Sequence, residues 1–205
     1  MHFTKEIIHE YDGVYIMKID PGKIGFDFDG VVADTMEAFI RLADQDYAIK
    51  VSPSEITEFM VEECLDIDQE IINDIFGRLL LDPLGVGLEP MTDAIRVLEE
   101  LAWEAPLTFI TARPEVEPVA AWLDCHLSSK IFAQSRLIAT GDHDGKAEHI
   151  REMGLSYFVD DRADTCNVLA QDQGIIPIIY DQPWNRGKHN LDSVCSWQGI
   201  REMCN

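Results

Sequence analysis

The sequence predicts an α/β fold with a Rossmann-like, mainly parallel sheet. Short apolar runs typical of buried strands alternate along the chain with segments whose apolar residues recur at helical spacing. A chain that alternates in this way forms right-handed crossovers, which place helices on both faces of one sheet. The predicted strands lie at residues 23–28, 106–111, 136–140, 156–160 and 175–180.

Helices are expected between these strands. The clearest covers residues 91–103, where Thr92 can cap the first turn and Ile95, Leu98 and Leu101 fall on one face. Two others, at residues 145–154 and 163–174, end in glycine, which favours the termination of a helix. The remaining predicted helices lie at residues 115–127 and 196–203.

One segment breaks the alternation, because residues 34–88 contain no convincing strand. Two runs with apolar residues at helical spacing flank the sequence SPSEITEFM, residues 52–60. The serine, proline and glutamate that open it predict a capping box with proline at the first helical position. We therefore predict a core of residues 1–33 and 89–205 and a helical cap of residues 34–88, inserted after the first core strand as a lid.

Apolar residues of the predicted cap have helical spacing and are expected to form its own core. Part of this face could instead stack on a substrate base. These residues are Phe39, Phe59, Met60, Ile71, Ile75 and Phe76.

The N-terminus carries a strong local signal for a β-hairpin. The sequence YDG, residues 11–13, stands between two strand-like runs, and Asp-Gly is a favoured two-residue hairpin turn. Two roles stay open for this hairpin: it could extend the sheet, or it could pair subunits into a homo-oligomer through an exposed edge.

Charge and composition exclude several classes of partner. The chain of 205 residues carries 16 Lys and Arg against 38 Asp and Glu, a formal net charge of −22, which opposes binding to nucleic acid polymers and anionic membranes. No apolar run is long enough to span a membrane, and the N-terminus lacks the apolar segment of a signal peptide, so we expect a cytoplasmic location. The five cysteines form no CxxC pair, and neither disulfides nor a zinc site are expected.

Polar residues follow three of the predicted strands, at the point where each strand ends. They are Asp27 and Asp29 after the first strand, Thr111, Ala112 and Arg113 after the second, and Asp160 and Asp161 after the fourth. Lys146 opens the helix that precedes the fourth strand. Because ligands bind at the carboxyl ends of parallel strands, we expect these residues to gather at one edge of the sheet.

Four of these residues are carboxylates, and like charges this close raise one another's pKa in a poorly solvated crevice. A hard cation removes this conflict. Mg²⁺ binds carboxylates, carbonyl oxygens, water and substrate phosphates, and it would also supply the positive charge that an anionic substrate needs in so acidic a protein. Asp27 and Asp29 share a strand face, and Gly30 allows the sharp turn that brings both to one reacting centre.

Together, these residues resemble the four short motifs of the haloacid dehalogenase superfamily of phosphotransferases. The motifs read DFDGV at 27–31, FITARP at 109–114, Lys146, and VDDR at 159–162. Their order and spacing cover most of the chain, and the predicted cap lies where that superfamily has its first type of cap. The resemblance implies a phosphoryl-transfer enzyme with a Rossmann-like core.

The resemblance also implies a role for each motif residue. Asp27 would attack phosphorus to form an aspartyl-phosphate, and Asp29 would protonate the leaving oxygen and later activate water. Thr111 and Lys146 would hold the transferring phosphoryl oxygens.

The implied Mg²⁺ ligands are Asp27, the backbone carbonyl of Asp29, and the acidic pair Asp160 and Asp161. Within this pair, Asp161 is expected to be the direct ligand and Asp160 its support.

Within the superfamily, the chain is similar to the 5′(3′)-deoxyribonucleotidases and their bacterial relatives. The similarity lies in the small helical cap, the sequence LEPMTDAIRVLEEL before the second strand, the VDDR form of the fourth motif, and SWQGI near the C-terminus. The sequence TARP stands where animal members have TSP. The residues expected to bind substrate are Thr111, Ala112, Arg113 and Lys146.

These observations predict a Mg²⁺-dependent phosphomonoester hydrolase that acts on a small phosphorylated substrate, a nucleoside monophosphate. Two alternatives stay open. One is a phosphatase for sugar phosphates or other small phosphoesters, and the other is a non-catalytic binding protein that kept the fold.

The run YDQPWNRGKHN, residues 180–190, follows the last predicted strand and can therefore reach the rim of the site. Trp184 or Arg186 could contact substrate there, but an ordinary loop is the favoured interpretation. His143, between two aspartates, is interpreted in the same way, as part of a solvated loop.

Overall fold

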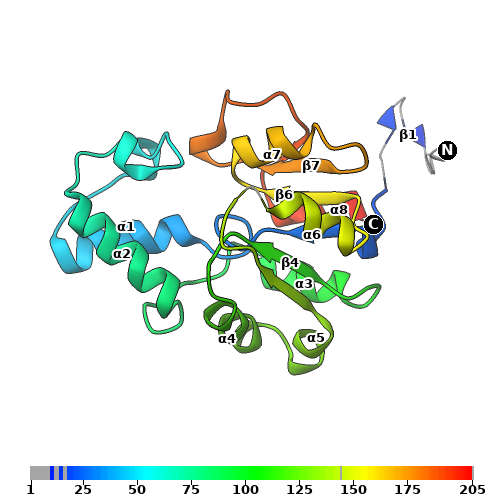
Figure 1. Ribbon diagram of the computed structural model, residues 1–205, viewed down its shortest axis with the longest axis horizontal. Coiled ribbons are helices and arrows are strands. Elements are labelled where there is room, and N and C mark those ends of the chain that lie inside the picture. Colours follow the sequence, from blue (N-terminus) through cyan, green and yellow to red (C-terminus); the bar gives the residue numbers. More distant parts are fainter. Residues whose placement is uncertain (1–9, 12–13, 16–17, 144, 205) are drawn as a thin grey trace.

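The computed structural model describes residues 10–11, 14–15, 18–143 and 145–204. Within these residues, a six-stranded parallel sheet has the order β5-β4-β3-β6-β7-β8 (Figure 1). Its strands are β3 (Ile24–Phe26), β4 (Thr108–Thr111), β5 (Arg136–Ala139), β6 (Tyr157–Asp160), β7 (Ile176–Tyr180) and β8 (Ser193–Val194). The predicted α/β fold with a parallel sheet is confirmed, and the short β8 is an addition to the five predicted strands.

Helices cover both faces of this sheet. They are α3 (Ala94–Leu101), α4 (Glu117–His126), α5 (Ser129–Gln134), α6 (Lys146–Glu152), α7 (Ala163–Leu169) and α8 (Trp197–Cys204). Neighbouring residues of a strand point to opposite faces. On one face, Phe158 of β6 packs with Ile150 of α6 and Leu169 of α7. On the other face, the ring of Phe26 in β3 lies 5.1 Å from that of Trp197 in α8.

The start of α3 differs from the prediction. Asp93, not Thr92, is the N-cap residue, and its backbone is left-handed with a φ of 66°. Aspartate is one of the few residues that adopt this conformation at moderate cost. Asp93 makes no side-chain bond to the helix backbone, and its carboxylate pairs with Arg96 at 3.1 Å instead. The predicted cap at Thr92 is therefore wrong.

Residues 52–60 also form less helix than predicted. The capping box is present, because the backbone N–H of Ser52 donates to Oε2 of Glu55 at 2.7 Å. The turn that it opens is a short 3₁₀ helix, η2 (Pro53–Glu55), and the chain then turns inward at the fully buried Ile56. A second 3₁₀ helix, η3 (Val61–Glu63), follows.

The two 3₁₀ helices lie between two longer helices, α1 (Thr35–Tyr47) and α2 (Gln69–Leu81). Both longer helices lie beyond one end of the sheet (Figure 1, left). The rings of Phe39 in α1 and Phe76 in α2 stack at a centroid distance of 5.0 Å. These two of the predicted cap residues thus pack together as expected. The division into a core of residues 1–33 and 89–205 and a cap of residues 34–88 stays a prediction.

Near the N-terminus, β1 (Glu10–Tyr11) pairs antiparallel with β2 (Val14–Tyr15), and these two strands form a separate sheet in the described part of the chain. The pairing agrees with the predicted hairpin. Its turn at residues 12–13 and most of its predicted strands lie outside the described residues.

Two simple features accompany the fold. None of the helices in the described ranges combines the length and apolar character that a bilayer span requires. All five cysteines carry free thiols, in agreement with the expected lack of disulfides.

Leu98 of α3 is fully buried against the sheet, so Leu98→Ala should lower the free energy of unfolding by about 2–5 kcal/mol through lost burial and a residual cavity. Leu81→Ala is the matched control, because Leu81 is 74% exposed and its truncation should change stability by less than about 0.5 kcal/mol. Urea denaturation followed by circular dichroism measures both. Equal effects of the two substitutions would contradict the assigned packing.

Candidate active site

The carboxyl ends of β3, β4 and β6 meet at one edge of the sheet, because β3 lies between its two parallel neighbours. Asp27 follows β3 directly, and its backbone N–H donates to the carbonyl of Val159 at 2.9 Å. Thr111 is the last residue of β4, and Asp160 is the last residue of β6. Strand pairing alone therefore brings three predicted site residues to one edge.

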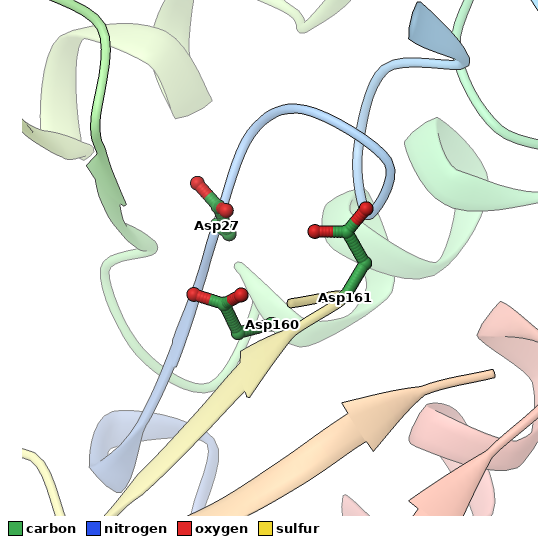
Figure 2. Close-up of side chains that lie close together, drawn as sticks. All are labelled: Asp27, Asp160 and Asp161. Atoms are coloured by element: carbon green, nitrogen blue, oxygen red, sulfur yellow. The ribbon is translucent and has the colours of Figure 1, made fainter. Parts of the chain in front are cut away.

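Asp27, Asp160 and Asp161 form a buried acidic cluster, in which carboxylate oxygens of the three residues lie within 4.8 Å of one another. Figure 2 shows their carboxyl groups gathered beside the loop that follows β3. Lys146, at the start of α6, is fully buried, and its Nζ lies 2.7 Å from Oδ2 of Asp27 and 2.7 Å from Oδ2 of Asp160. One lysine and three predicted aspartates thus share a single site.

Gly30 is required by this cluster for two reasons. Its φ of +68° lies in the left-handed region, which residues with a Cβ rarely adopt. A Cβ on Gly30 would also lie 2.0 Å from Oδ2 of Asp161, inside the carboxylate. The glycine therefore permits both the turn after β3 and the position of Asp161.

Asp29 points to different partners. Arg113 binds its carboxylate with two parallel bonds, from Nε to Oδ2 and from Nη2 to Oδ1, both at 2.8 Å. The hydroxyl of Thr35 donates to Oδ1 of Asp29 at 2.5 Å. The third donor group of Arg113, Nη1, donates to the carbonyl of Leu79 at 2.8 Å, in the last turn of α2. Arg113 therefore connects Asp29 to the predicted cap.

Thr111 and Ala112 occupy the loop between β4 and this arginine. The hydroxyl oxygen of Thr111 accepts the backbone N–H of Arg113 at 3.3 Å, and Thr111 is buried. Ala112 and Arg113 line a cavity, whereas Thr111 and Lys146 lie beneath its surface.

Burial and charge set the pKa values of the cluster. Burial raises the pKa of Asp27 to about 7, with Lys146 opposing the shift and Asp160 adding to it. Burial and then the neighbouring charges of Asp160 and Asp27 raise the pKa of Asp161 well above its usual range. Burial disfavours the charged form of Lys146, but Asp160 and Asp27 outweigh it and hold the pKa of the lysine above its ordinary value.

Asp29 has the opposite shift. Burial would raise its pKa, but the charge and hydrogen bonds of Arg113 and the hydroxyl of Thr35 outweigh burial and lower the pKa below its usual value. Asp29 is therefore an ionised carboxylate in this geometry.

The donor atoms of the acidic cluster fit a hard divalent cation. Carboxylate oxygens are preferred ligands of Mg²⁺. Among the described residues of the site, Asp29 is balanced by Arg113, whereas the three carboxylates of the cluster share only Lys146. Two of the three carboxylates thus lack a balancing cation, and burial together with the charges of Asp160 and Asp27 raises the pKa of Asp161.

A cavity of about 410 Å³ lies above these residues, between the sheet edge and the segment with α1 and α2. Asp29, Arg113 and Asp161 contribute to its polar part. Its apolar lining comes mainly from that segment: Met36, Phe59, Met60, Val61, Ile72, Phe76, Leu79 and Leu80.

Phe59 closes one side of this cavity. Its ring lies 5.2 Å from the guanidinium carbon of Arg162 and 5.4 Å, edge to face, from the ring of His143. His143 is not part of the acidic cluster, but it packs against an aromatic side chain and lines the cavity, unlike the solvated position expected from the sequence. Nearby, Lys188 donates to the carbonyl of Thr57 at 2.9 Å and so joins the loop after β7 to the same segment.

The loop after β7 contributes residues that the favoured sequence interpretation missed. The indole N–H of Trp184, in the 3₁₀ helix η4 (Pro183–Asn185), donates to Oδ2 of Asp161 at 3.1 Å. Trp184 also lines the cavity, whereas Arg186 pairs with Asp181 at 2.8 Å and does not. The sequence did contain a signal for Trp184, because its loop follows a strand whose carboxyl end lies at the ligand-binding edge of the sheet. No comparable signal pointed to Thr35.

Solved structures share this fold at low sequence identity. A hydrolase of the haloacid dehalogenase-like family from Streptococcus pneumoniae is 16% identical, with a TM-score of 0.59 over 86% of this chain and 95% of that one. A haloacid dehalogenase superfamily hydrolase of subfamily IA from Geobacter sulfurreducens is 13% identical, with a TM-score of 0.56 over 89% and 95% of the two chains. No curated protein sequence matches this chain.

A family model gives the closer assignment. The model described as "5' nucleotidase, deoxy (Pyrimidine), cytosolic type C protein" matches residues 22–204, nearly the whole chain. This match spans the four motifs and all six strands of the parallel sheet. The chain therefore belongs to this nucleotidase family, and it is a phosphatase of the haloacid dehalogenase superfamily.

Proposed function

We propose that this phosphatase hydrolyses nucleoside monophosphates through an aspartyl-phosphate on Asp27, with Mg²⁺ as its cofactor. The observation that supports this most strongly is the acidic cluster with its single buried lysine, set beneath a cavity with apolar walls. A surplus of buried carboxylates is unfavourable unless a cation or a proton accompanies it.

In the first step, a carboxylate oxygen of Asp27 bonds to phosphorus while the bond from phosphorus to the ester oxygen breaks. Asp27 is held for this attack, because Lys146 binds its Oδ2 and the backbone N–H of Phe28 donates to its Oδ1 at 2.7 Å. Lys146 and Thr111 would hold the oxygens of the phosphoryl group, one by charge and one by hydrogen bonding. In the second step, water attacks the same phosphorus and releases Asp27.

Asp29 would act on the protons in both steps. As an ionised carboxylate it is ready to accept a proton from water in the second step. To donate a proton to the leaving oxygen in the first step, it must first become protonated, which its pair with Arg113 opposes. We propose that substrate draws Arg113 away from Asp29, and that Arg113 and Ala112 contact substrate in this way.

The residues that would hold Mg²⁺ are Asp27, Asp161 and the backbone carbonyl of Asp29, with Asp160 in support. Both carboxylate oxygens of Asp160 already accept bonds, from Lys146 at 2.7 Å and from the backbone N–H of Arg162 at 2.8 Å. Among the described residues, the carboxylate of Asp161 accepts one hydrogen bond, from Trp184, which makes Asp161 a better direct ligand than Asp160. When bound, Mg²⁺ would neutralise the excess charge and polarise the phosphoryl oxygens.

The cavity supports a nucleotide as substrate. Its volume of about 410 Å³ is within the range of small-molecule sites. Its apolar lining suits the base of a nucleotide better than the hydroxyl groups of a sugar phosphate. The family description names deoxynucleotides with a pyrimidine, and it also names a cytosolic protein, in agreement with the cytoplasmic location that we propose. Sugar phosphates and other small phosphoesters are the alternative substrates.

The alternative of a non-catalytic binding protein has less support. All motif residues keep side chains that can perform the proposed chemistry, and the acidic cluster retains its lysine. Membership in the phosphatase superfamily also favours turnover.

The first test is hydrolysis of p-nitrophenyl phosphate. The wild-type protein should require Mg²⁺, and Asp27→Asn should reduce kcat by at least about 10³-fold, because an amide cannot form the aspartyl-phosphate. Asp124→Asn, at an exposed position of α4, is the control and should leave kcat unchanged. Turnover that is independent of both Mg²⁺ and Asp27 would contradict the proposal.

A second test concerns Asp29. Asp29→Asn should lower kcat by about 10²–10⁴-fold, because proton transfer is lost, while the Kd for vanadate changes less than about threefold. Calorimetry measures the binding of this phosphate mimic. Loss of vanadate binding by a folded Asp29→Asn protein would show that Asp29 has a binding role and not the proposed catalytic one.

A third test addresses substrate class. Met60 lines the cavity and is 48% exposed, so Met60→Ala should preserve the fold but raise KM for a deoxypyrimidine monophosphate by about three- to tenfold through lost apolar contact. KM for phosphoglycolate, which has no base, should stay unchanged, and Leu81→Ala should alter neither value. Higher kcat/KM for sugar phosphates than for nucleotides would favour the alternative.

A further inference from the structure

The loop after β7 holds the region of the acidic cluster at several points. The side-chain N–H groups of Asn185, which is fully buried, donate to the backbone carbonyls of Asp161 and Tyr180, each at 2.8 Å. The side-chain amide of Gln182 donates to the carbonyl of Gly30 at 2.8 Å. Thus the loop binds both the turn after β3 and the end of β6.

Trp184 lies between these two anchors and is 5% exposed. The residues on either side of it are fixed relative to each other, because the backbone N–H of Gln182, the N-cap residue of η4, donates to Oδ1 of Asn185 at 3.2 Å. The indole N–H therefore approaches Asp161 from a rigid turn. It donates to Oδ2 of the carboxylate at 3.1 Å.

This bond is made to a carboxylate that lacks a cationic partner of its own. Lys146 binds Asp27 and Asp160, and Arg113 binds Asp29, so Asp161 forms no ion pair with the described residues. The charges of Asp160 and Asp27 repel it. A single directional donor consequently fixes which oxygen of Asp161 faces the indole and which faces the rest of the cluster.

Other buried tryptophans do not share this arrangement. The indole N–H of Trp122 donates to the carbonyl of Leu88 at 2.7 Å, and that of Trp197 donates to the carbonyl of Val31 at 2.8 Å. Both acceptors are neutral backbone groups. Trp184 is distinguished from these two by a charged acceptor within a candidate metal site.

We infer that Trp184 is a positioning residue for the divalent cation, whose indole N–H orients Asp161 as a ligand. This inference rests on the proposed function, because it requires the acidic cluster to bind Mg²⁺. Hydrogen-bond donors behind metal ligands commonly change affinity by about 10–100-fold when removed.

The experiment compares the Mg²⁺ affinity of the wild-type chain with that of Trp184 variants. Affinity is measured by isothermal calorimetry and by competition with Mn²⁺ in electron paramagnetic resonance. Trp184→Phe keeps an aromatic ring but removes the N–H, and should raise the Mg²⁺ Kd by about 10–100-fold. With p-nitrophenyl phosphate at saturating Mg²⁺, kcat should return to within about threefold of wild type. Trp122→Phe is the matched control and should leave the Kd unchanged.

A second variant separates the hydrogen bond from packing. Trp184→His also reduces the ring but keeps a ring N–H, so at pH 8 its Kd should be closer to wild type than that of Trp184→Phe. Equal Mg²⁺ affinity of wild type and Trp184→Phe, or equal losses in the histidine and phenylalanine variants, would overturn the inference. Absence of Mg²⁺ binding by the wild-type protein would instead overturn the proposed function and, with it, this inference.

Discussion

The excess of negative charge at the carboxyl edge of the sheet is the constraint on which the rest of the site depends. Three buried aspartates share one lysine, and each of their neighbours is adapted to this concentration of charge. Lys146 is fully desolvated between two carboxylates, and Gly30 has no side chain where Asp161 needs room. Such a cluster of buried charged side chains is stable only because strands, turns and hydrogen bonds hold each residue in place.

The fold creates this edge from ordinary packing forces. Parallel strands bring distant parts of the sequence to one line, and apolar residues such as Phe26 and Phe158 bury the two sheet faces beneath it. The chemistry is then carried by residues at the ends of the strands or directly after them, where backbone geometry is less regular. Stability and reactivity thus occupy neighbouring but separate parts of each strand.

The sequence was sufficient to predict the sheet, the helical segment after β3 and the residues of the acidic cluster, because apolar periodicity and strand ends are local signals. It was insufficient where long-range contacts decide. The pair between Asp29 and Arg113 joins residues 84 positions apart, and the bond from Trp184 to Asp161 depends on how one loop folds back. The sequence did not identify Asp93 as the N-cap, because Thr92 and Asp93 are adjacent residues that can both cap a helix and only the folded backbone decides between them. The strand β8 is too short to show periodicity.

The position of Arg113 has a consequence for how the enzyme would discriminate among ligands by size. One guanidinium contacts both Asp29 and the last turn of α2. A ligand too large for the cavity would hold α2 away from the sheet and thereby remove one anchor of the arginine. An arginine that has lost its contact with α2 would keep only its pair with Asp29, which opposes protonation of that carboxylate. Oversized phosphoesters would then bind with proton transfer impaired, so that selection by size would act on turnover more than on affinity.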